Sequence, residues 1–169
     1  MKFQTTLQNF NSNLWGYHIP VPLAIAKSFI DDSGQRVLCT LNGQKQIHCA
    51  LMPDGKGGFF INLNKELRKE LKLSLGDSIE VELQKDESKY GMPVPEELAA
   101  LFEIDEEGSK YFHELTPGKQ RSLIYQIGKP KNSDTRLQKA IVIFDYLKST
   151  RGRLDYKELQ QAFKDRKGT

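Results

Sequence analysis

The chain has 169 residues and a formal net charge of +3, and 38% of its residues are hydrophobic while 28% are charged. This composition excludes collagen-like and disordered chains, and two cysteines cannot build a disulfide scaffold. No apolar run reaches the roughly 18 residues of a membrane helix, and the N-terminus lacks the apolar stretch of a signal peptide, so we expect a cytoplasmic protein without membrane contact.

The first half of the chain contains an internal repeat. Residues 3–41 align with residues 45–83 at an ungapped offset of 42, which superposes Gly16 on Gly58 and Gly34 on Gly76. Each copy has the pattern of two strands, a short helix and a last strand. The strands are apolar on one face only, so the two copies are predicted to bury each other in a small closed barrel capped by the two short helices. We expect a pseudo-two-fold axis to relate the copies.

A hairpin is predicted where the two copies join. Asn42-Gly43 between two strands is a strong signal for a two-residue turn. Such a turn would place Cys39 opposite Gln46 and Cys49 opposite Arg36. The two thiols would then point to opposite faces of the sheet, which disfavours a disulfide between them.

The remainder of the chain reads as a linker followed by helices. Gly91, Pro93 and Pro95 give residues 87–95 the composition of a linker. The apolar spacing that follows predicts helices over 96–102, 105–115, 117–128 and 133–150, with a short last helix after residue 155. The fold class is therefore α+β, with a β-barrel over 1–86 and an all-α module over 96–169. The helix from residue 133 is expected to form the buried centre of that module.

Charge is distributed unevenly along the chain. Residues 87–114 hold two basic and eight acidic side chains, whereas residues 115–169 hold thirteen basic and five acidic ones. Such asymmetry can mark a surface for nucleic acid or an acidic partner. The alternative is that the acidic and basic helices pack on each other.

The basic region contains the best candidate site. Lys129, Lys131, Thr135, Arg136 and Lys139 lie in a loop and in the first turns of the longest predicted helix. Amide groups at a helix N-terminus together with Lys and Arg suit an anion. Structural ion pairs with the acidic region remain the competing interpretation.

Other chemistry has less support. Histidine and cysteine show no metal-ligand spacing, no nucleophile motif is present, and the glycine-rich loop over 53–58 precedes a strand and reads as a hairpin. We therefore expect no metal, no cofactor and no catalytic residue, although a triad assembled in space stays open. Trp15, Tyr17 and Arg68 are candidates to line a groove, with packing as the alternative role.

Two family resemblances cover nearly the whole chain. The helix, Gly76-Asp77 turn and strand of residues 64–83 resemble the double-split β-barrels of AbrB-like and MazE-like DNA-binding proteins, and residues 1–86 resemble an uncharacterised bacterial domain family of that fold. The following segment resembles the bacteriocin-protection, YdeI/OmpD-associated family. The residues that carry this second resemblance are Val94-Pro95-Glu96-Glu97-Leu98, Phe112, Leu115-Thr116-Pro117, Gly128-Lys129 and Asp134-Thr135-Arg136. These resemblances imply a bacterial protein and a double-split barrel, but no activity.

Two functional hypotheses follow. The first is a non-enzymatic interaction module that binds nucleic acid or an acidic partner through its basic C-terminal surface. The second is a small-ligand-binding protein or an enzyme that uses a groove between barrel and helices. Salt dependence separates them, because phosphate binding weakens steeply with ionic strength.

Overall fold

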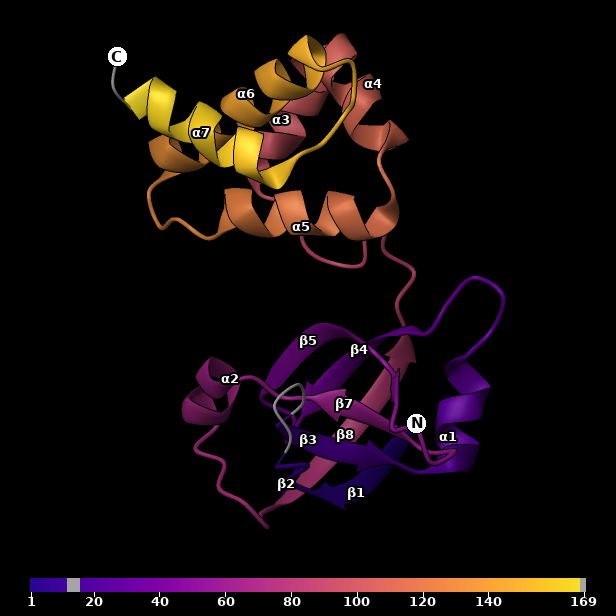
Figure 1. The fold of residues 1–169 in the computed structure, drawn as a ribbon. Coiled ribbons are helices and arrows are strands. Elements are labelled where there is room, and N and C mark those ends of the chain that lie inside the picture. The colour runs from indigo at the N-terminus through magenta and orange to yellow at the C-terminus, as the bar shows by residue number, and fades with distance from the viewer. Residues whose placement is uncertain (12–15, 168–169) are drawn as a thin grey trace. The chain divides into compact units, whose positions relative to one another are not determined.

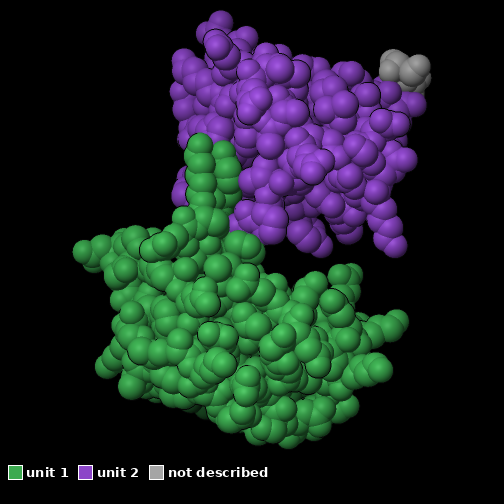
Figure 2. All heavy atoms as spheres, turned by 180° about the vertical axis from the view of Figure 1, so that it is seen from behind, with its two compact units in different colours: residues 1–91 green, residues 92–169 purple. Residues whose placement is uncertain are grey.

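The computed structural model describes residues 1–11 and 16–167. The chain divides into two compact units, residues 1–91 and residues 92–169 (Figure 2). Trp15, predicted to line a groove, lies outside the described residues. None of the described helices is long and apolar enough to cross a membrane.

The described residues of the first unit, 1–11 and 16–91, form two antiparallel sheets and two short helices (Figure 1). Its elements are β1 (Lys2–Thr6), β2 (Gln8–Asn9), β3 (Tyr17–Val21), α1 (Leu23–Phe29), β4 (Arg36–Leu41), β5 (Lys45–Ala50), β6 (Met52–Pro53), β7 (Phe59–Asn62), α2 (Lys65–Glu70) and β8 (Ser78–Lys85). The strand orders are β1-β8-β4-β5 and β2-β3-β7-β6, and the glycine-rich loop joins β6 to β7 as a hairpin. Both sheets contribute buried side chains to one core. The described pairing gives two open sheets, so closure into a barrel stays a prediction.

The strand pairing has the symmetry expected from the repeat. Exchanging β1, β2, β3 and β4 with β5, β6, β7 and β8 leaves both strand orders unchanged. Ile19 pairs with Ile61 between β3 and β7, and Thr40 pairs with Glu82 between β4 and β8. In each of these pairs the two residues are 42 positions apart, so they occupy equivalent positions in the two copies. Exchanging the copies therefore leaves each pair unchanged. The offset of 42 therefore holds from β3 onward.

The ungapped alignment was wrong for the first two strands of each copy. Val81 in β8 is equivalent to Cys39 in β4 at the offset of 42. Val81 pairs with Phe3 and Cys39 pairs with Ile47, so Phe3 and Ile47 are equivalent and lie 44 positions apart. The cause is loop length, because seven residues separate β2 from β3 whereas five separate β6 from β7. A two-residue insertion in the first copy accounts for the difference.

The predicted hairpin register was also wrong by one residue. Leu41 pairs with Lys45, so the loop holds Asn42, Gly43 and Gln44, and the first two of these have positive φ angles of 51° and 63°. A shift of one residue moves a side chain to the other face of a sheet.

This register places the two thiols on the same face. Cys39 now lies opposite Ile47, and Cys49 lies opposite Val37. A hydrogen bond with Cys49, together with burial, raises the pKa of the Cys39 thiol. Both cysteines are free in the structure.

In the described part of the second unit, residues 92–167, five helices form a bundle around the longest one. They are α3 (Glu96–Ile104), α4 (Glu106–Glu114), α5 (Pro117–Gly128), α6 (Ser133–Ser149) and α7 (Tyr156–Lys167). Helix α6 packs against each of the other four, as its wide apolar face predicted (Figure 1). Asp105, Thr116 and Asn132 cap the N-termini of α4, α5 and α6 with their side-chain oxygens.

A glycine fixes the distance between α4 and α6. Gly108 lies inside α4, where glycine is unfavourable for helix stability. A Cβ atom built on Gly108 would lie 2.8 Å from Cγ of Phe144. Glycine therefore allows the fully buried Phe144 ring to pack directly on the α4 backbone.

Candidate functional site

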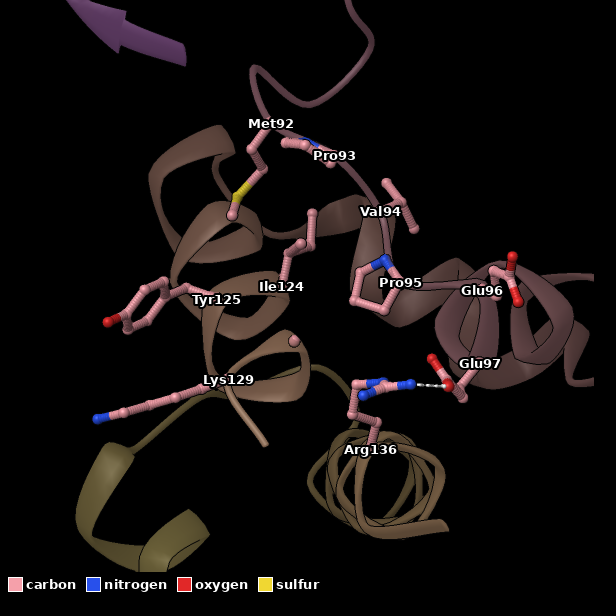
Figure 3. A pocket seen from close by; sticks show the side chains of 11 residues that line it. Met92, Pro93, Val94, Pro95, Glu96, Glu97, Ile124, Tyr125, Lys129 and Arg136 are labelled. Atoms are coloured by element: carbon pink, nitrogen blue, oxygen red, sulfur yellow. Dashed lines mark hydrogen bonds and ion pairs between the residues drawn. The ribbon is translucent and has the colours of Figure 1, made fainter. Parts of the chain in front are cut away.

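The second unit contains a pocket of about 500 Å³ between the segment that leads into α3, helix α5 and the start of α6. Figure 3 shows its side chains: Tyr125 and Lys129 lie at one end, Glu96 lies at the other, and Arg136 points toward Glu97. The lining residues are Met92, Pro93, Val94, Pro95, Glu96, Glu97, Ile124, Tyr125, Gly128, Lys129 and Arg136. We call this cavity the α3–α5 pocket.

Local sequence shapes the wall of the pocket. Pro95 occupies the position before α3 with φ −56° and ψ 141°, so the chain enters the helix from an extended conformation. Gly128, the last residue of α5, faces Pro95: a Cβ atom at this glycine would lie 3.2 Å from Cγ of Pro95. The small residue therefore brings the end of α5 close to the proline segment.

An ion pair fixes one side of the pocket. Nη2 and Nε of Arg136 donate to the same oxygen of Glu97, at 2.8 Å and 3.0 Å, and the Ser133 hydroxyl donates to it at 2.7 Å. Nη1 of Arg136 donates to the carbonyl oxygens of Pro130 and Lys131. Arg136 thus ties α6 both to α3 and to the loop before α6.

The electrostatics follow from these hydrogen bonds. The Arg136 guanidinium and the Ser133 hydroxyl lower the pKa of Glu97 to about 2, and Glu97 in turn raises the pKa of Arg136. Both groups are therefore charged at neutral pH. The two opposite charges cancel, so the pair adds no net charge to the pocket and acts by holding α6 to α3.

A second ion pair joins the acidic and basic regions. Nζ of Lys148 in α6 lies 2.7 Å from Oδ2 of Asp105. Burial raises the pKa of Asp105, but hydrogen bonds from Lys148 and from the Gly108 amide outweigh it, so the net shift is downward. Arg136 and Lys148 thus show that part of the basic region is paired internally with the acidic region.

Two family models match this chain. Residues 3–83 match Domain of unknown function (DUF1905), and residues 91–149 match OmdA, described as Bacteriocin-protection, YdeI or OmpD-Associated. No curated protein matches the chain. All residues that line the α3–α5 pocket lie within the OmdA segment.

The OmdA segment does not bring the five predicted anion-site residues together. Lys129 and Arg136 line the α3–α5 pocket, whereas Thr135 and Lys139 line another pocket between α6 and α7. Lys131 contributes its carbonyl oxygen to Arg136. Successive residues of the first turns of α6 point in different directions, which divides the cluster.

The DUF1905 segment does bring Tyr17 and Arg68 together. Cζ of Arg68 lies 3.7 Å from the centroid of the Tyr17 ring, and its Nε donates to the carbonyl oxygen of Leu63. This cation–π contact joins α2 to β3. The geometry gives both residues a packing role within the first unit.

Sequence reasoning predicted Lys129 and Arg136 and missed the other nine residues that line the α3–α5 pocket. Met92 lies in the predicted linker over 87–95, and Ile124 lies in the predicted helix over 117–128. Tyr125 was not singled out, although it is 59% exposed and follows two buried residues of α5. A large aromatic residue on the solvent face of an amphipathic helix is the signal that could have revealed it.

The composition of the pocket favours binding. Its walls are largely apolar, and the charged pair Arg136–Glu97 is internally compensated. No serine, cysteine or histidine is among its lining residues. In the described part of the chain, no group of three or more His, Cys, Asp or Glu side chains could hold a metal ion.

Proposed function

We propose that the chain is a non-enzymatic binding module whose α3–α5 pocket takes a small ligand with an apolar body and one acidic group. The observation that carries this proposal is the pocket itself, which is preformed by several chain segments and is held by the Arg136–Glu97 pair. Its volume of about 500 Å³ lies in the range of small-molecule sites.

The walls of the pocket suit a ligand with an apolar body. Met92 and Pro95 lie on either side of Ile124, Tyr125 follows on α5, and Val94 also lines the pocket (Figure 3). Tyr125 offers an exposed ring, so covering it with an apolar ligand removes apolar surface from water.

The charges around the pocket suit a ligand with an acidic group. Glu97 holds Arg136 directly, and the charge of Glu96 also favours the charged form of Arg136. Lys129 is exposed, and among the described residues it makes no ion pair. Its ammonium group at the Tyr125 end is therefore available to a carboxylate.

The same geometry ranks this proposal above binding of nucleic acid at the predicted cluster. Arg136 is the central cation of that cluster, and its guanidinium already donates hydrogen bonds to Glu97 and to two carbonyl oxygens. A phosphate would have to displace these internal partners.

The test uses the full chain labelled with nitrogen-15 and three ligands of equal length: hexanoate, 1-hexanol and hexylammonium. We expect hexanoate to shift amide signals of residues 92–97 and 124–129, and hexylammonium to bind most weakly. Exposed ion pairs contribute about 0.2–1 kcal/mol, so Lys129→Gln should weaken hexanoate binding by up to about fivefold and leave 1-hexanol binding unchanged.

A matched control lies on α5, the helix that ends just before Lys129. Lys119 is exposed and does not line the pocket, so Lys119→Gln should bind hexanoate like the wild type. Equal loss of affinity in both variants, or shifts spread over other surfaces, would contradict the proposal.

A further inference from the structure

A second hollow lies in the OmdA-containing unit, between α6 and α7. It has a volume of about 400 Å³ and shares no residue with the α3–α5 pocket. Its lining residues are Thr135, Gln138, Lys139, Val142, Gln160, Phe163, Arg166 and Lys167. We call it the α6–α7 groove; the two helices run beside each other and are in contact (Figure 1).

The charge of this groove is one-sided. The groove is lined by the cations Lys139, Arg166 and Lys167, and no carboxylate is among its lining residues. Arg166 is already paired, since its Nη1 lies 3.3 Å from Oδ2 of Asp145. Among the described residues, Lys139 and Lys167 make no ion pair, so two positive charges at the groove lack compensation.

The uncharged lining residues complete an amphipathic site. Val142 is buried and Phe163 is half-buried, and together they form an apolar floor. Nζ of Lys139 lies 5.6 Å from the centroid of the Phe163 ring, so a cation stands beside this floor. Thr135 and Gln138 add side chains that can donate hydrogen bonds.

We propose that the α6–α7 groove binds a small phosphate monoester that carries an aromatic group. A phosphate monoester has a charge of about −1.5 to −2 at neutral pH, which matches the two uncompensated lysines. Its aromatic ring would lie on Phe163 and Val142, and its oxygens would accept from the lysines, Thr135 and Gln138. This inference is independent of the function proposed for the α3–α5 pocket.

Charge placement favours a single phosphate over a nucleic-acid strand. A strand needs a row of cations that follows its backbone. The same two helices carry the acidic residues Asp134, Asp145 and Asp165, which would repel phosphates running along them. Three of their cations, Lys139, Arg166 and Lys167, instead line one groove.

The test follows amide shifts of the full chain at 50 mM salt with phenyl phosphate as the probe. We expect shifts of residues 135–142 and 160–167, and the affinity of the groove is read from these residues alone, separately from any shifts at residues 92–97 and 124–129 of the α3–α5 pocket. Inorganic phosphate lacks the ring and benzyl alcohol lacks the charge, so both should bind at least fivefold more weakly. Equal binding of inorganic phosphate, or tighter binding of oligothymidylate than of phenyl phosphate, would overturn the proposal.

Substitutions make the test specific. Lys139→Gln and Lys167→Gln should each weaken phenyl phosphate binding about fivefold, the upper range for an exposed charge contact. Lys119→Gln, which lies outside both cavities, should have no effect. Unchanged shifts of the groove residues in both groove variants would overturn the proposal, and reading binding at residues 135–142 and 160–167 keeps this result separate from the α3–α5 pocket.

One further probe distinguishes the two sources of the phosphate group, a phosphorylated protein and a free metabolite. A capped tripeptide with a central phosphotyrosine presents the same chemical group within a chain. Tighter binding of the tripeptide than of phenyl phosphate would support a phosphorylated protein as the source, and equal affinity would support a free metabolite.

Discussion

Arg136 gives both of its hydrogen bonds to Glu97 to a single carboxylate oxygen, at 2.8 Å and 3.0 Å, across 39 residues of chain. The side chain of Glu97 is only 11% exposed and that of Arg136 is 25% exposed. This contact closes one side of the α3–α5 pocket, and its strength depends on the ionisation of Glu97.

Glu97→Gln should make the second unit less sensitive to acid. The pKa of Glu97 is about 2 in the folded protein, below its ordinary value of 4.5. A depressed folded pKa contributes stability that is present above pH 4.5 and is lost as the pH falls toward 2. The melting temperature of the wild type should therefore fall more steeply between pH 6 and pH 3 than that of the variant, as followed by circular dichroism.

Glu103→Gln is the matched control for that series. Glu103 is an exposed residue of the same helix and makes no ion pair in the described structure. Its variant should keep the acid sensitivity of the wild type. Parallel pH profiles for wild type and Glu97→Gln would show that the Arg136 contact adds nothing to stability.

Gly108→Ala should destabilise the second unit by about 1–3 kcal/mol, because a new Cβ would overpack the Phe144 ring. Gly118→Ala is the control, since no atom lies within 4 Å of its Cβ position in α5. Alanine there should be neutral or stabilising by up to about 1 kcal/mol. Urea unfolding measures both, and equal effects would contradict the packing described for Gly108.

The two thiols should differ in reactivity. Cys39 is fully buried and its pKa is raised, whereas Cys49 is half-buried and lines a pocket. Iodoacetamide reacts with thiolates, so the native protein should be alkylated at Cys49 first. Mass spectrometry of peptides gives the order, and labelling of Cys39 at the same rate would contradict the burial of Cys39 in the core.

Arg68→Ala should lower the stability of the first unit by about 0.5–1 kcal/mol through loss of the Tyr17 contact. Lys69→Ala, on the exposed face of α2, should cost less. Thermal unfolding compares the two variants. No difference between them would leave Arg68 without the packing role assigned above.

The elements themselves were largely predictable from the sequence. Asn64 and Thr116 accept backbone hydrogen bonds at the starts of α2 and α5, and a side chain of this type before a helical pattern is a sequence signal for a helix start. Such a signal depends only on neighbouring residues. The symmetry of the sheets was also readable, because the repeat is visible in the sequence and its offset of 42 reproduces the pairs Ile19–Ile61 and Thr40–Glu82.

Register and site composition were not predictable in the same way. The turn at Asn42 can hold two or three loop residues, and one residue decides whether Cys39 and Cys49 share a face. The basic cluster could be seen, but its division could not, because the partner of Arg136 lies far away in sequence at Glu97. Tyr125 was missed because periodicity marks buried residues and says nothing about an aromatic side chain on the exposed side of a helix.

The central claim is that the α3–α5 pocket holds a ligand with an apolar body and an acidic group. The most direct measurement is the set of nuclear Overhauser effects between the methyl group of bound hexanoate and the methyl groups of the full chain. We predict contacts to the Met92 ε-methyl and the Ile124 δ-methyl, with the hexanoate carboxylate toward Lys129. Contacts to methyl groups elsewhere, or none to Met92 and Ile124 at saturating hexanoate, would contradict the claim.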